Sequence, residues 1–174
     1  MRLLKKLCFA TTALVLFAPP ASSQEPETAP VPRAVTALKG CWKGSGEVMG
    51  KAVTIALTAG PIAHDALFVV DAASVASADP TDRYAAHLIF GGADKDPARI
   101  TGFWADSFGG AYTATGSGQV RADGFEMVYP YPDNDFVNRW HITPGQLTWQ
   151  IVARDAKGVE QPFASYTLRT AACG

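Results

Sequence analysis

The chain has 174 residues, 48% of them hydrophobic and 18% charged, and its formal net charge is −1. This length suits one domain with a core of its own. The lack of a basic excess argues against nucleic-acid binding, and the apolar content argues against intrinsic disorder.

The first 23 residues are typical of a secretory signal peptide. Three basic side chains lie within residues 1–6, a short apolar stretch spans residues 7–18, and small residues occupy positions 21–23. This order of basic, apolar and small segments directs export, and the apolar stretch falls short of the roughly 20 residues of a transmembrane helix. A buried N-terminal helix is the alternative. We therefore expect a periplasmic or secreted protein with no membrane span, whose net charge changes from −1 to −4 when the signal and its three cations are removed.

A leader is predicted over residues 24–40. Residues 24–32 (QEPETAPVP) are rich in proline, which indicates a flexible or extended segment. Residues 33–39 fit one or two helical turns that end at Gly40. The folded domain is accordingly expected over residues 41–174.

Cys41 and Cys173 are the only cysteines after the predicted signal. In an oxidising compartment they are expected to form a disulfide, which requires the first and last elements to lie side by side with Cα atoms within roughly 7 Å. Two free buried thiols are the alternative. No metal site is expected, because no CxxC pair and no paired histidine spacing accompanies the two cysteines.

The domain is predicted to consist of β-strands. Short runs with strand-like patterning are each followed by turn residues such as Gly60-Pro61 or Asp79-Pro80. The expected strands lie near residues 41–48, 51–59, 65–75, 82–90, 98–106, 110–117, 118–129, 134–143, 146–154 and 159–170. No segment has a long helical pattern, which excludes a parallel α/β fold. Ten consecutive antiparallel strands with joined ends favour an all-β, closed up-and-down barrel; a sandwich is the alternative, but its crossovers need longer connections.

Three short turns offer a test of this prediction, because each hairpin turn determines which residues of its two strands lie opposite each other. Turns at Met49-Gly50, Asp123-Gly124 and Pro144-Gly145 all give hairpins with one apolar and one polar face, as a half-buried antiparallel sheet requires. The predicted partners are Trp42 with Leu57, Val120 with Met127, Arg121 with Glu126, and Trp140 with Trp149.

The start of the domain resembles a known family. Gly40-Cys41-Trp42 has the G-x-W pattern of the first lipocalin strand, and residues 38–48 (LKGCWKGSGEV) are similar to the L-x-G-x-W-x-G-x-G start of lipocalin-like bacterial domains of the DUF1579 and nitrobindin types. The resemblance implies an up-and-down barrel of eight to ten strands. It also implies an arginine of the last strand packed over the tryptophan, for which Arg169 is the candidate. Haem binding is not expected from the resemblance, because the residues around His141 lack the sequence pattern that surrounds the haem-binding histidine of nitrobindins. No cofactor is therefore expected.

An inner wall of aromatic residues favours a binding role. If Trp42 points inward, strand alternation places glycines, alanines and large aromatic side chains on the inside, so that small residues leave room for a ligand. The expected ligand-binding residues are Trp104, Tyr129, Asn138, Trp140 and Trp149. The leading hypothesis is an exported protein that holds a small hydrophobic or amphipathic ligand inside the barrel without chemistry. A packed aromatic core with no cavity is the alternative, and such a barrel would serve as an envelope interaction module.

Catalysis is the third hypothesis. The sequence has no G-x-S-x-G, and its three histidines lack the spacing of metal ligands. The nearest enzyme-like group is Asp106, Asp133, Asn134 and Asp135 with Arg139, which would serve an isomerase or hydrolase at the barrel mouth. Because acidic loop residues usually cap turns, no catalytic residue is assigned.

Overall fold

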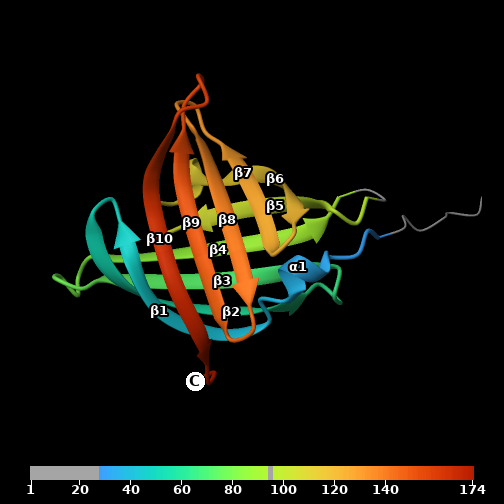
Figure 1. The fold of residues 1–174 in the computed structure, drawn as a ribbon, viewed down its shortest axis with the longest axis horizontal. Helices are drawn as coiled ribbons and strands as arrows, with labels where there is room; N and C mark the ends of the chain where they lie inside the picture. The colour runs from blue at the N-terminus through green and yellow to red at the C-terminus, as the bar shows by residue number, and fades with distance from the viewer. Residues whose placement is uncertain (1–27, 94–95) are drawn as a thin grey trace, which may run out of the picture.

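The structure is a computed structural model that describes residues 28–93 and 96–174, so the predicted signal peptide at residues 1–23 lies outside the described residues. The described chain forms ten strands with a short helix before them and a 3-10 turn (Figure 1). In chain order these are α1 (Arg33–Thr36), β1 (Gly40–Val48), β2 (Lys51–Ile62), β3 (Leu67–Ala76), β4 (Arg83–Gly92), β5 (Arg99–Asp106), η1 (Gly110–Tyr112), β6 (Ala114–Arg121), β7 (Gly124–Pro130), β8 (Asp135–Thr143), β9 (Gln146–Arg154) and β10 (Glu160–Ala171). No helix within these residues is long and apolar enough to cross a membrane.

The strands close into one barrel. Each strand pairs antiparallel with its sequence neighbours, and β1 pairs with β10 to complete the ring. In Figure 1 the strands β8–β10 in front cross β2–β4 behind them at a steep angle, as expected for tilted strands of a barrel. The predicted fold class, an all-β up-and-down barrel of about ten strands, is confirmed.

Two of the three predicted hairpins have the expected register. Trp42 lies opposite Leu57 on β2, and Trp140 lies opposite Trp149 on β9. The strand predicted to begin at residue 110 instead begins at Ala114, after the 3-10 turn.

The third hairpin was predicted wrongly. Its turn residues are 122–123, so Val120 lies opposite Phe125 rather than Met127. The physical reason is that Gly124 belongs to β7, where it lies against the backbone of β8. Any Cβ at this position would lie 1.8 Å from the carbonyl oxygen of Trp140, so the glycine is required in the strand and not in the turn. Because the shift is two residues, each side chain keeps its predicted face.

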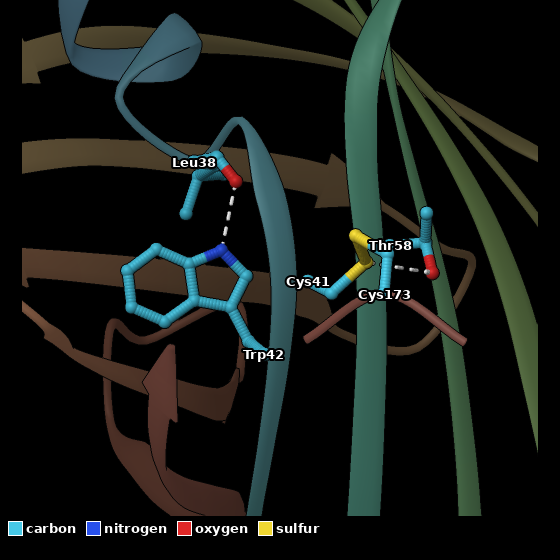
Figure 2. Close-up of a disulfide and its surroundings, with 5 residues drawn as sticks. All are labelled: Leu38, Cys41, Trp42, Thr58 and Cys173. Atoms are coloured by element: carbon cyan, nitrogen blue, oxygen red, sulfur yellow. Dashed lines mark hydrogen bonds between the residues drawn. A yellow bond between two sulfur atoms is a disulfide. The ribbon is translucent and has the colours of Figure 1, made fainter. Parts of the chain in front are cut away.

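Helix α1 closes one end of the barrel. Pro32, Val35 and Leu38 are buried there, and the carbonyl oxygen of Leu38 accepts a hydrogen bond of 2.8 Å from the Trp42 indole (Figure 2). The arginine that the family resemblance implied over Trp42 is not there. Arg169 is exposed and lies opposite Lys43 on the outer face, so that prediction is wrong.

The seam between β1 and β10 carries a covalent link. Cys41 and Cys173 form the expected disulfide, with a Cα–Cα distance of 5.3 Å across a sequence separation of 132 residues. The Thr58 hydroxyl lies 4.0 Å from the Cys41 sulfur, on the neighbouring strand β2 (Figure 2). The first and last strands are thus held together by both a hydrogen-bonded ladder and a disulfide.

Candidate functional site

The five side chains predicted to line a ligand site lie together inside the barrel. Trp104 comes from β5, Tyr129 from β7, Asn138 and Trp140 from β8, and Trp149 from β9. The rings of Trp140 and Trp149 stack at 4.2 Å, Trp104 lies 6.0 Å from Trp149, and Tyr129 lies 5.4 Å from Trp104. The structure therefore brings these residues into one aromatic cluster, and their role in binding stays a prediction.

The side chain of Asn138 forms its hydrogen bonds within the protein. Its side chain is fully buried, and its Oδ1 accepts a hydrogen bond of 3.0 Å from the Trp149 indole. Its amide group donates to the Phe136 carbonyl at 3.4 Å. Asn138 therefore orients Trp149, which leaves little of its hydrogen-bonding capacity for a ligand.

Two other buried donors have no partner among the described residues. They are the hydroxyl of Tyr129 and the indole N–H of Trp140. Burial, and then the nearby Tyr131, raise the pKa of Tyr129, so this hydroxyl keeps its proton. A buried donor without an acceptor costs about 1–3 kcal/mol, so both groups are natural contacts for an added acceptor.

The inner glycines do not leave the space that the sequence predicted. A Cβ at Gly46 would lie 2.7 Å from the Tyr166 ring, and one at Gly116 would lie 2.6 Å from the Tyr129 ring. Met127 covers Gly102 and Gly118 in the same way. These glycines allow large side chains of neighbouring strands to lie flat against the wall.

The inner wall is slightly more exposed toward the end opposite α1, which we call the open end. Deep residues such as Leu88 and Phe90 are fully buried. Toward the open end several inward-facing side chains are small and keep a little exposure, 6% at Ser74 and 8% at Ala114, and Trp104 also keeps 8%. Strands β3 and β4, which carry many of these small residues, lie across the ring from β8 and β9. Small side chains therefore face the tryptophans across this half of the barrel.

Asp106 organises the rim of the open end. One carboxylate oxygen accepts hydrogen bonds from the Tyr84 hydroxyl at 3.0 Å and the Trp104 indole at 3.1 Å. The other accepts from the Phe108 backbone N–H at 2.9 Å. Burial, and then the charge of Asp106, raise the pKa of Tyr84. Sequence reasoning missed Tyr84 because no local pattern connects it to residues more than twenty positions away.

The candidate catalytic group is not assembled. Asp106, Asp133, Asn134 and Asp135 do share the open end, as predicted, but Arg139 lies on the outer wall. There its guanidinium donates to Glu126 at 3.0 Å and to Glu160 at 2.6 and 2.9 Å. Asp135 is paired with Arg154 at 3.0 Å. The expectation that Arg139 joins these carboxylates at the mouth is therefore wrong.

The histidines lie on the surface. His87 contacts Asp71, and His141 contacts Asp123 at 2.7 Å. His64 lies in the β2–β3 turn, where its φ is 55°. Among the described residues no three metal-ligating side chains come together.

The outer wall has two hollows. Trp140 lines the first and Asp106 the second, but none of Trp104, Tyr129, Asn138 and Trp149 lines either of them. One, of about 380 Å³, is lined by charged and polar side chains of β6 to β9 that include Arg121, Glu126 and Arg139. Both arginines are paired there with Glu126. The other, of about 420 Å³, has a floor of alanines on β3 to β5. The open end of the barrel is therefore the better candidate site.

Comparison with known proteins supports the architecture. No protein-family model and no curated protein matches this sequence. Among solved structures, Rv2717c from M. tuberculosis is similar with a TM-score of 0.62 and 13% identity, over 81% of this chain and 99% of that one. The S-type phycobiliprotein lyase CPES from Guillardia theta is similar with a TM-score of 0.55 and 14% identity, over 80% and 91% of the two chains. At these identities the likeness shows the fold alone, a closed antiparallel β-barrel.

Proposed function

We propose that this protein is an exported carrier that binds a small hydrophobic or amphipathic molecule through the open end of its barrel, without chemistry. The observation that carries the proposal is the pair of unpaired donors, Tyr129 Oη and Trp140 Nε1, within an otherwise apolar aromatic cluster. An apolar site with a few polar groups is the usual form of a small-molecule site. The lyase named among the structural neighbours fits a barrel that handles a small organic molecule, and the start motif at residues 38–48 fits a lipocalin-like bacterial domain.

Binding is tested on the purified protein. Organic extracts are analysed by mass spectrometry for a co-purifying ligand, and tryptophan fluorescence is titrated with fatty acids and with small aromatic molecules. Since all of the clustered tryptophans contact one another or Tyr129, an occupied site is expected to quench their emission. No extracted ligand and unchanged fluorescence across the panel would refute the proposal.

Export is tested separately. The full chain is produced in a bacterium beside a form that lacks residues 1–23, and the mass of each product is measured in periplasmic and cytoplasmic fractions. Export predicts that only the full chain reaches the periplasm and that its mass there has fallen by that of the signal. An uncleaved full chain in the cytoplasm would contradict it.

A second candidate function is an interaction module with a filled core. It is favoured by the way Tyr166, Tyr129 and Met127 occupy the space above the inner glycines. This candidate predicts that no small molecule in the panel binds while the protein still captures a macromolecular partner.

A further inference from the structure

We propose that the open end selects amphiphiles with a cationic head group, which sits against Asp106 while the apolar part lies against the aromatic cluster. This inference rests on the proposed binding function and adds the chemical class of the ligand.

The first observation is a carboxylate without a cation. Asp106 accepts hydrogen bonds only from neutral donors, namely Tyr84, Trp104 and the Phe108 backbone. No basic side chain of the described residues forms an ion pair with it, whereas Asp82 and Asp135 at the same end pair with Lys51 and Arg154. Three hydrogen bonds fix the carboxylate in place and leave its negative charge unbalanced, so a positive group is its natural complement.

Several aromatic side chains lie on the same rim as this carboxylate. The Tyr84 ring lies 5.6 Å from Phe108, and Phe108 lies 6.0 Å from Tyr112. The Tyr131 hydroxyl donates to the Tyr112 carbonyl at 2.7 Å, which joins the β7–β8 and β5–β6 loops over the same side of the mouth. Ring faces attract ammonium groups most strongly when the site is partly desolvated. Phe108 and Tyr112 are exposed, so their rings are free to contact a bound cation.

A second, independent observation concerns the buried side chain of Tyr129. Tyr129 contacts Trp104 at 5.4 Å, and its buried hydroxyl has no protein acceptor. Trp104 therefore connects the Asp106 carboxylate, through its indole N–H, to an unpaired donor deeper in the barrel. A molecule with a cation at one end and an acceptor along its body would satisfy both groups.

The charge of the open end agrees with this selection. Around its loops and strand ends the acidic side chains outnumber the basic ones. They are Glu47, Asp79, Asp82, Asp106, Asp133, Asp135, Asp155 and Glu160, against Lys51, Arg83, Arg154, Lys157 and Arg139, the partner of Glu160. A mouth of one charge sign concentrates ligands of the opposite sign and repels those of the same sign.

The test compares three ligands of equal chain length: decyltrimethylammonium, decanol and decanoate. Each is titrated below its micelle concentration into the wild-type protein, Asp106→Asn and Asp133→Asn, with tryptophan fluorescence and calorimetry as readouts. Asp133→Asn is the matched control, since it removes one exposed charge from the same end without touching the aromatic groups. We expect the wild type and the control to bind the ammonium roughly ten-fold more tightly than decanol. In Asp106→Asn that preference is lost while decanol binding is retained.

The outcomes separate the two proposals. Binding of the three ligands with no preference for the cation, or an unchanged preference in Asp106→Asn, overturns this inference and leaves the carrier function standing. Binding of none overturns both. If Asp106→Asn does not fold, Tyr84→Leu replaces it, because that variant keeps the carboxylate but removes one aromatic face. Tyr84→Leu is expected to weaken the binding of decyltrimethylammonium more than the binding of decanol, and an equal effect on both ligands refutes the inference.

Discussion

The buried hydrogen bond between Asn138 and Trp149 gives the sharpest test of how the interior is held. Asn138→Leu replaces the only buried side-chain amide among the described residues by an apolar group of similar volume, so it leaves no large cavity. It removes the acceptor 3.0 Å from the Trp149 indole and leaves that N–H buried and unpaired. The lost bond and the unpaired donor together cost about 2–3 kcal/mol in the free energy of unfolding. For a chain of this size this corresponds to a fall in Tm of roughly 4–10 °C.

A double-mutant cycle isolates the bond. Trp149→Phe removes the donor, so Asn138→Leu should cost less in that background, with a coupling free energy of about 1–2 kcal/mol. Urea unfolding followed by far-UV circular dichroism gives the four stabilities without relying on tryptophan emission. A coupling close to zero would show that Asn138 and Trp149 contribute independently, and would refute the reasoning.

Three further predictions concern the wall, the surface and the seam. Gly46→Ala places a Cβ 2.0 Å from the Ser165 carbonyl oxygen and should lower the free energy of unfolding by about 2–3 kcal/mol. Gly60→Ala has open space at its Cβ and is the control, which should change the free energy of unfolding by less than about 0.5 kcal/mol in the same denaturation assay. Hydrogen bonds from Arg139 hold the pKa of Glu160 below its ordinary value, so this stabilisation is present above the ordinary pKa and is lost as the pH falls through the lowered one. Thermal melts should therefore show the difference in stability between wild type and Arg139→Met shrinking as the pH falls into the acid range, and a constant difference would contradict it. Joint replacement of Cys41 and Cys173 by serine should lower the free energy of unfolding by less than the roughly 4.7 kcal/mol of the loop-entropy estimate. The reason is that the hydrogen-bonded pairing of β1 with β10, from Cys41 to Val48, still closes the barrel. A variant that fails to fold would show that this pairing alone does not suffice.

Much of the barrel could be predicted from residue alternation and turns. The pairing of Trp140 with Trp149 follows from a short turn at Pro144-Gly145 and a side-chain period of two, so no tertiary information was needed. The disulfide followed from two cysteines at the two ends of one domain. Proximity of the five wall residues followed from the same alternation, since each was assigned to the inner face of a closed ring.

The failures have a common cause. Asp123-Gly124 has the composition of a favoured turn, but contact with Trp140 on another strand required the glycine inside β7. Arg169 was placed over Trp42 by resemblance, while the α1 segment supplies that contact through the Leu38 carbonyl. Both outcomes depend on which backbones approach each other, which a linear pattern does not record.

The seam between β1 and β10 brings the first and last strands together in a barrel whose every other strand pairing is a local hairpin. The wall of the barrel is therefore a closed ring, and the disulfide between Cys41 and Cys173 is the covalent bond that joins its first and last strands. A ring of successive hairpins has no privileged starting strand. The natural order of the sequence is one of several equivalent ways to write the same barrel, and an opening at a different loop would preserve every pairing that forms its wall.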